Sequence, residues 1–129
     1  MQSVVRIAAA LRPAEAARRT GVTIKTLRHY EKRALLKPKR TARGWRVYER
    51  KDIERLEQIL AFKAMGFGLS QIASLLDTSP DVIATALAAQ ELNLKGQARE
   101  IGEALDAVRK ARGKRAAPGR LGAPLALAA

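Results

Sequence analysis

The chain has 129 residues, no cysteine, one histidine and a formal net charge of +13 at pH 7. A chain of this length builds one domain with appendages. The lack of cysteine excludes disulfides, thiolate metal sites and iron–sulfur clusters, and a single histidine does not make a transition-metal site. We therefore expect no metal and no cofactor. No apolar run approaches the ~20 residues of a membrane span, so we expect no membrane partner. The absence of cysteine fits the cytoplasm, where we expect the protein.

The positive charge is concentrated near the start of the chain. Residues 1–48 contain 13 lysines and arginines but only two acidic residues, Glu15 and Glu31, whereas residues 49–112 are close to neutral. A one-sided basic excess is typical of a surface that binds phosphate groups. Charge alone would fit DNA, RNA or an anionic membrane equally well. Sequence motifs are needed to distinguish between these partners.

Residues 1–12 are interpreted as a lead-in, and a first helix is expected from Pro13. Proline suits the first helical turn, and the alanines that follow give a smooth face on which a second helix can pack. Arg12 stands where a Ser or Thr cap is usual, so this helix is expected to start without a side-chain cap. Gly21 then marks a tight turn, because glycine tolerates a positive φ.

A second helix is expected after Thr23, which is a good N-cap. Val22 is expected in the small core between the two helices. Ile24, Leu27 and Glu31 are expected on the packed side of the second helix, and Lys25, Arg28, His29 and Lys32 on its other sides. Two short helices joined by a glycine turn predict a helix-turn-helix, whose second helix enters a DNA major groove. His29 is interpreted as a polar residue at the edge of that surface.

A basic hairpin is predicted over residues 37–48. Arg43-Gly44 is a turn signal, and the residues from Trp45 to Tyr48 alternate as a strand does. We interpret Trp45 as a core anchor that holds the hairpin, in preference to a DNA contact.

Two further helices are expected before residue 80. Asp52 begins or caps the third, and Gly66 ends it. Ser70 is expected to cap a short fourth helix. The core positions expected here are Phe67, Leu69, Ile72, Leu75 and Leu76. Residues 77–80 are read as a loop that leads into the next helix.

A long helix is predicted over about residues 81–112. An apolar stripe runs along it, and its expected dimerisation residues are Leu87, Leu94, Ile101, Leu105 and Val108. One chain offers no second long helix to cover such a stripe, so a homodimer through a coiled coil is expected. The alternative is a bent helix that packs on its own head. Gly96 and Gly102 each cost ~1 kcal/mol of helix propensity.

Residues 113–129 are rich in Gly, Pro, Ala and Arg, and we expect them to be disordered. The end, Leu127-Ala128-Ala129, resembles the terminus of the bacterial trans-translation tag, although an inert Ala-rich end is the favoured interpretation.

The motifs taken together resemble the MerR family of bacterial transcriptional regulators. The resemblance rests on the order and spacing of Thr20-Gly21-Val22-Thr23, Leu27-Arg28-x-Tyr30-Glu31, Arg43-Gly44-Trp45-Arg46-x-Tyr48, Asp52-Ile53-x-x-Leu56 and Gly66-Phe67-x-Leu69. It implies a mainly α fold with a winged helix-turn-helix over residues 13–79. It also implies an antiparallel dimerisation helix over residues 80–112. Many relatives carry an effector domain or a metal-binding loop after this helix, but residues 113–129 have neither the length nor the ligand chemistry for either, so we expect no effector domain here.

The resemblance further implies a function. Members bind a near-palindromic promoter site as homodimers, and they bend and untwist it so that RNA polymerase can engage. In this chain it implies that Arg46 reaches the minor-groove side or the backbone and that Tyr48 contacts phosphate. Independently of the resemblance, we expect Tyr30 to donate its hydroxyl to a phosphate while its ring packs on the edge of the core. The DNA-binding residues predicted from motif and charge are Arg18, Thr23, Lys25, Thr26, Arg28, His29, Tyr30, Lys39, Arg40, Arg43, Arg46 and Tyr48.

Two other functions stay open on the sequence. One is an architectural or excisionase-like DNA-binding accessory protein, and the other is a small helical adaptor whose long helix binds a different protein. An enzyme is not expected, because the sequence has one histidine, no cysteine, no Gly-rich phosphate loop and no evident pair of catalytic carboxylates.

Overall fold

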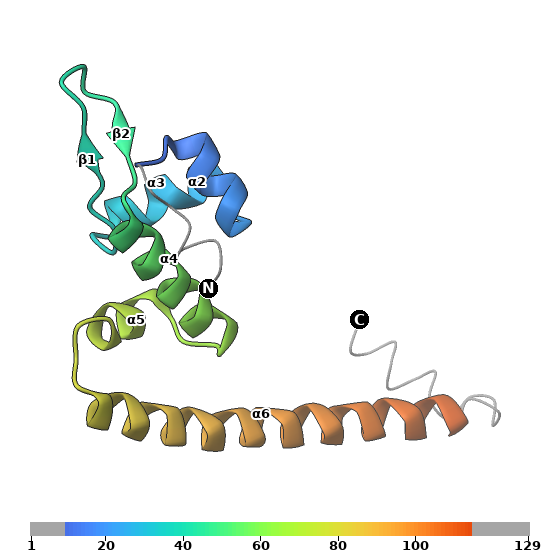
Figure 1. Ribbon diagram of the computed structural model, residues 1–129. Helices are drawn as coiled ribbons and strands as arrows, with labels where there is room; N and C mark the ends of the chain where they lie inside the picture. Colours follow the sequence, from blue (N-terminus) through green and yellow to red (C-terminus); the bar gives the residue numbers. More distant parts are fainter. Residues whose placement is uncertain (1–9, 115–129) are drawn as a thin grey trace. The chain divides into compact units, whose positions relative to one another are not determined.

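The computed structural model describes residues 10–114, and these residues are mainly helical (Figure 1). In chain order the elements are α2 (Pro13–Thr20), α3 (Ile24–Lys32), β1 (Lys39–Arg40), β2 (Arg46–Val47), α4 (Arg50–Ala64), α5 (Leu69–Leu75) and α6 (Pro80–Lys114). This confirms the predicted class of a helical head with a short hairpin and a long last helix. The expectations for most of the lead-in and for the tail, including its Leu-Ala-Ala end, fall outside residues 10–114.

The chain forms two compact units, one through Ile83 and one from Ala84 onward. The first contains α2 to α5, the hairpin and the start of α6. The second consists, in its described part, of the rest of α6. Each unit is described by itself below.

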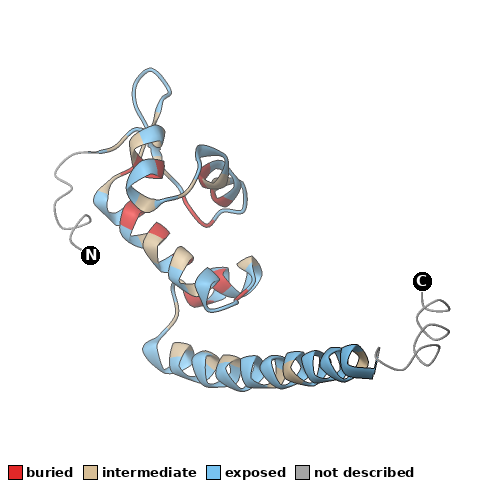
Figure 2. Ribbon diagram, turned by 90° about the vertical axis from the view of Figure 1, so that its right-hand side faces the viewer, coloured by how far each residue is buried: buried red, intermediate tan, exposed pale blue. Residues whose placement is uncertain are grey.

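The core of the first unit is built from the helices α2 to α5 and from residues that connect the elements, whereas the two strands and the start of α6 have no buried residue. Figure 2 shows buried positions on the inner faces of its helices. The largest fully buried side chains are Tyr48, Leu27, Leu36, Ile53, Leu56, Ile59 and Ile72. Phe62 and Phe67 pack edge to face, with ring centroids 5.8 Å apart. Of the core positions expected here, Phe67, Ile72 and Leu75 are buried, and Leu69 and Leu76 are only partly buried.

The packed side of α3 is narrower than predicted. Leu27 is fully buried and Val22 is partly buried, but Ile24 is 38% exposed. The expectation for Ile24 is wrong because it lies in the first turn of a short helix, where the neighbouring helix does not cover it.

The ends of α4 and α5 have specific polar partners. The backbone N–H of Glu49 donates to the buried Asp52 carboxylate at 2.8 Å, so Asp52 caps α4 from its first turn. Gly66 follows the end of α4 with φ 94°, as expected of a glycine at a helix C-terminus. Ser70 does not cap α5, contrary to expectation, because the helix begins one residue earlier. The Gly68 N–H instead donates to the side chain of Gln71 at 2.9 Å.

The hairpin pairs β1 with β2 in antiparallel register, with Lys39 opposite Val47 and Arg40 opposite Arg46. Gly44 lies in the turn with φ 83°, as predicted from Arg43-Gly44. The end of the hairpin is tied to the start of the described chain, because Leu11 and Tyr48 form an antiparallel bridge.

In the second unit, α6 is a single helix without one buried residue. It extends slightly beyond the predicted residues 81–112 at both ends. Its apolar side chains are exposed, among them Leu87 at 39%, Leu94 at 41% and Ile101 at 67%.

Candidate nucleic-acid interface

The angle between α2 and α3 is fixed by a glycine turn and a threonine cap. Gly21 has φ 78°, and its N–H donates to the Ala17 carbonyl at 2.9 Å. The Thr26 N–H donates to the Thr23 hydroxyl at 3.0 Å, which confirms the predicted cap. Arg12 makes no side-chain cap for α2, also as expected. The two helices are thus held as a helix-turn-helix by local hydrogen bonds and by the buried Ala16.

The face of α3 that turns away from the core is polar and basic. Lys25, Arg28 and His29 are exposed, and Thr26 is partly exposed. The Thr23 and Thr26 hydroxyls are 3.0 Å apart and share a hydrogen bond. A short helix that exposes two cations and two hydroxyls near its N-terminus can offer donors to base edges and phosphates.

Tyr30 belongs to the packed side of α3. It is 5% exposed, and burial raises the pKa of its hydroxyl. Its ring lies 6.1 Å from the His29 ring in a tilted arrangement. This agrees with the expectation that the Tyr30 ring packs at the edge of the core.

Arg18 lies on α2 and is paired within that helix. Its guanidinium, and that of Arg19 at 3.0 Å, contact the carboxylate of Glu15. Hydrogen bonding to Arg19 is the largest influence that lowers the pKa of Glu15. The pairs are exposed, so they contribute little stability and leave the arginines able to turn toward a phosphate.

Three of the predicted hairpin cations are also paired with carboxylates. Lys39 Nζ lies 3.4 Å from Glu49, and Arg40 lies 3.8 Å from Glu31. Arg46 Nε lies 2.6 Å from Glu31 in a half-buried pair. The hairpin is therefore fastened to α3 through Glu31, which lies partly buried at the edge of the packed side of α3.

Trp45 is 46% exposed, so its interpretation as a core anchor is wrong. The Arg12 guanidinium lies over the Trp45 ring, 4.1 Å from its centroid, and the Arg43 guanidinium lies 5.6 Å away. The strands are only two residues long and Trp45 precedes β2, so its ring cannot reach the core of the head. The hairpin thus carries an exposed aromatic ring with two cations beside it.

Tyr48 is fully buried, and its hydroxyl has no hydrogen-bond partner within the described part of the chain. Burial is the main cause that raises the pKa of this hydroxyl, and the charge of Glu31 raises it further. The ring thus serves as core packing under the hairpin. The role that the resemblance gives Tyr48, a phosphate contact, stays a prediction.

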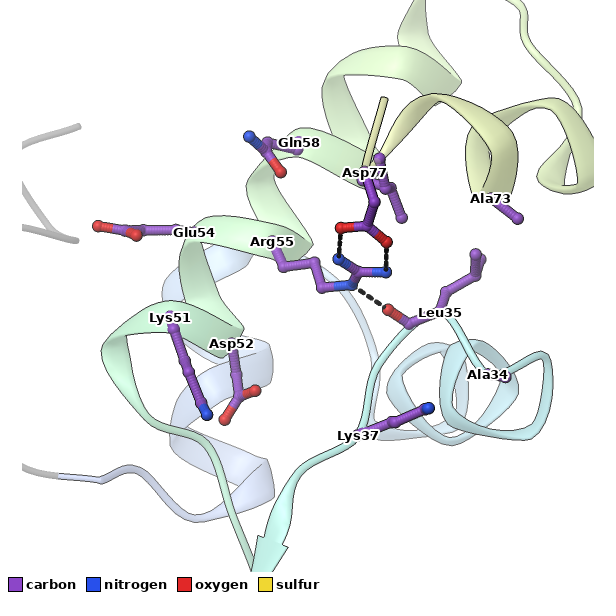
Figure 3. Close-up of a pocket in the computed structure, with 11 residues that line it drawn as sticks. Ala34, Leu35, Lys37, Lys51, Asp52, Glu54, Arg55, Gln58, Ala73 and Asp77 are labelled. Carbon is purple, nitrogen blue, oxygen red and sulfur yellow. Dashed lines mark hydrogen bonds and ion pairs between the residues drawn. The ribbon is translucent and has the colours of Figure 1, made fainter. Parts of the chain in front are cut away.

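Arg55 joins three segments of the head, as Figure 3 shows. Its Nε–H donates to the Leu35 carbonyl at 2.6 Å, and its terminal groups donate to both oxygens of Asp77, at 3.0 and 3.3 Å. These bonds and the Arg55 charge lower the pKa of Asp77. The groove around them, of about 640 Å³, is lined by both cations and carboxylates, so it is not an anion site. No local sequence signal pointed to Arg55, because its partners are distant in the chain.

Two classes of site are not found in residues 10–114. There is no cluster of three or more His, Cys, Asp or Glu side chains that could hold a metal ion. In the same range no helix has the length and apolar character needed to cross a membrane.

Comparison with known proteins points to one family. Residues 11–79 match the family described as MerR HTH family regulatory protein. The chain is 40% identical over 93 residues to the HTH-type transcriptional regulator SkgA of Caulobacter vibrioides, covering 71% of this chain and 36% of SkgA. It therefore spans about a third of that relative's length.

Solved structures give the same result. A MerR family transcriptional regulator from Bacillus cereus superposes with a TM-score of 0.78 and 30% identity, covering 91% of this chain and 90% of the other. HiNmlR, a MerR family regulator that lacks the sensor domain and is bound to promoter DNA, superposes with a TM-score of 0.59 and 28% identity. That match covers 76% of this chain and 80% of HiNmlR.

Proposed function

The chain belongs to the MerR family of helix-turn-helix regulatory proteins, and on this premise we propose that it is a transcription regulator that binds a promoter site as a homodimer. Its relatives are transcriptional regulators and not enzymes. The proposed partners are double-stranded DNA, a second copy of the chain and RNA polymerase at the promoter, in the cytoplasm.

The observation that carries the proposal is the exposed basic face of α3 beside a basic hairpin in one unit. Lys25 and Arg28 project from α3, and Arg40, Arg43 and Arg46 belong to the hairpin. Such a pair of elements can contact a duplex at two neighbouring places, with the helix in the major groove and the hairpin along the backbone. The net charge of +13 supports phosphate binding over an interaction with cationic partners.

The exposed cations on α2, α3 and the hairpin have distinct roles in this proposal, and the exposed Trp45 joins them. Arg28 offers a bidentate donor to guanine or to phosphate, and Lys25 lies near the N-terminus of α3, where recognition helices approach bases. Arg43 and Trp45 meet the backbone from the hairpin. Arg18 and Lys39 exchange their exposed carboxylate partners for phosphate, which is feasible because exposed ion pairs are weak. Arg40 keeps its contact with Glu31 and offers its remaining N–H donors to the backbone.

The homodimer is supported by the exposed apolar stripe on α6. Leu87, Leu94, Ile101, Leu105 and Val108 are between 39% and 67% exposed. A second α6 would cover these side chains in an antiparallel coiled coil. Two heads on one dimer would bind the two halves of a near-palindrome. They could then hold that site bent and untwisted, a deformation that costs a few kcal/mol.

Binding is tested by fluorescence anisotropy of the protein with the duplex upstream of its own coding sequence, against a scrambled duplex, at two salt concentrations. We expect a preference of ~10³-fold or more for the upstream duplex. Equal, steeply salt-dependent binding to both duplexes, together with a genome-wide map lacking discrete symmetric sites, would favour an architectural or excisionase-like protein.

The contacts are tested with Arg28→Ala and Arg46→Ala. Arg28→Ala should cost about 1–3 kcal/mol on the specific duplex if it reads a base, and Arg46→Ala should weaken binding to all duplexes. Lys63→Ala is a matched control, since it removes one exposed charge from the far end of α4. If the double arginine variant binds like the control, the interface does not lie on α3 and the hairpin.

The dimer is tested by analytical ultracentrifugation of Leu94→Glu. We expect this substitution to give monomers and to weaken binding to the specific duplex. Leu92→Glu is the control, because Leu92 is 71% exposed and lies about 200° around the helix from Leu94. A monomeric wild type at micromolar concentration that captures a different protein would instead favour the adaptor function.

A further inference from the structure

We propose that Glu31 is a positioning residue, which locks the hairpin to α3 and thereby sets how strongly the protein discriminates between DNA sequences. The inference rests on the proposed DNA-binding function, and it adds a residue that makes no DNA contact itself. Glu31 lies near the C-terminal end of α3, and its carboxylate contacts an arginine on each strand of the hairpin.

The two contacts use different oxygens of one carboxylate. Oε1 accepts from Arg46 Nε at 2.6 Å, and Oε2 lies 3.8 Å from the terminal nitrogen of Arg40. The Glu31 and Arg46 side chains are 25% and 24% exposed, so water and salt screen this pair less than a surface pair. A short charge-assisted bond in such a setting fixes the guanidinium in one orientation.

The strand register explains why the hairpin needs this carboxylate. Arg40 and Arg46 are direct partners across the antiparallel pair, and like charges directly opposite each other destabilise a hairpin. Glu31 provides the negative charge between them. Within residues 16–48 the sequence contains 11 lysines and arginines but no acidic residue besides Glu31.

The geometry leaves Arg46 able to act on DNA. Glu31 uses the Nε–H of Arg46, and a guanidinium has four further N–H donors on its terminal nitrogens. With Glu31 in place, α3 and the hairpin approach the duplex as one rigid surface. Without it, Arg46 loses its carboxylate partner and Arg40 keeps only its bond to the Gly44 carbonyl, so the hairpin is held less firmly to α3 and both arginines can reach phosphates of any sequence.

Removal of the Glu31 carboxylate should therefore change DNA affinity in two ways, one that strengthens binding and one that weakens it. Removal of a negative charge should strengthen binding to non-specific DNA, because the surface becomes more cationic. Loss of the fixed geometry should at the same time weaken binding to the specific duplex relative to the non-specific one. A residue that served only as a charge would raise both affinities equally.

The DNA experiment compares Glu31→Ala, Glu31→Gln and Glu15→Gln in full-length protein by anisotropy on specific and scrambled duplexes. Glu15→Gln is the matched control, since it removes the same charge but its partners Arg18 and Arg19 lie on its own helix. We expect the specific-to-scrambled ratio to fall about tenfold in Glu31→Ala, as for one lost specifying contact. We expect a smaller fall in Glu31→Gln, which keeps an acceptor for Arg46, and no change in the control.

A second experiment needs no DNA, so it separates this inference from the proposed function. Backbone amide exchange is followed by NMR in the free protein at Thr41 and Gly44, whose N–H groups bond within the hairpin turn. We expect faster exchange in Glu31→Ala but not in Glu15→Gln, with the Leu27 amide unchanged as evidence of an intact fold.

The outcomes are separable. Unchanged hairpin exchange in Glu31→Ala overturns the inference, whether or not the protein binds specific DNA. Faster exchange with no sequence preference in the wild type keeps the lock but removes the proposed regulator. Faster exchange with an unchanged specific-to-scrambled ratio overturns the role of Glu31 in discrimination.

Discussion

Leu11 and Tyr48 exchange two backbone hydrogen bonds, each 2.7 Å long, which join the chain before α2 to the end of the hairpin. Arg12 reinforces this junction from the next position, because its guanidinium stacks on the Trp45 ring. Leu11 and Arg12, directly before the helix-turn-helix, are thus part of the folded head, and the Leu11 backbone helps to hold the hairpin in place.

A proline at position 11 tests this junction. Leu11→Pro should lower the free energy of unfolding by about 1–3 kcal/mol, because proline cannot donate the bond to the Tyr48 carbonyl. Urea unfolding followed by circular dichroism measures the change. Leu11→Ala is the control, since it keeps the N–H, and equal losses in both variants would show that the side chain alone matters.

Ala34 has φ 61°, the one positive φ found on a non-glycine residue in the described part of the chain. Ala34→Gly should raise the free energy of unfolding by about 0.5–1 kcal/mol, because glycine avoids the left-handed penalty but loses more entropy on folding. Thermal unfolding measures the gain.

Ala14→Gly is the matched control for that substitution. Ala14 is exposed in the first turn of α2, where φ is negative and glycine should destabilise by roughly 0.5 kcal/mol. A loss of stability in both variants would mean that position 34 is not strained in solution.

Tyr48→Phe separates the burial of Tyr48 from its expected phosphate contact. The hydroxyl is buried without a partner in residues 10–114, so its removal should raise stability by roughly 1 kcal/mol and leave DNA affinity unchanged. Anisotropy and urea unfolding on the same variant check both parts. A uniform loss of affinity for all duplexes would instead support the phosphate contact.

Asp77→Asn tests the clamp made by Arg55. The pKa of Asp77 is lowered from its ordinary value of 3.8 by the bonds to Arg55. A carboxyl with a depressed folded-state pKa stabilises the fold above its unfolded-state pKa, and this contribution is lost as pH falls through the folded-state pKa. The variant should therefore be less stable than wild type at neutral pH, and the gap should close below about pH 4.

Unfolding curves at a series of pH values measure that gap. Asp81→Asn serves as a control carboxyl at the start of α6. A gap between wild type and Asp77→Asn that stays constant down to pH 2 would show that the Arg55 pair does not contribute through its charge.

The sequence alone determined the local features of this protein. The turn at Gly21, the cap at Thr23, the hairpin turn at Gly44 and the end of α4 at Gly66 were all predictable. Each depends on the conformational freedom or hydrogen-bonding groups of residues within a few positions. The order and spacing of these residues also account for the resemblance to the MerR family.

Only the tertiary structure decided which contacts form between segments that are far apart in the chain. The exposure of Trp45, the burial of Tyr48 and the pairing of Glu31 with Arg46 depend on where a two-residue strand meets a helix. The clamp of Arg55 on Leu35 and Asp77 joins residues about twenty positions apart on either side. Local pattern cannot report such contacts, because a strand or helix periodicity gives the face of a residue but not the element that will cover it.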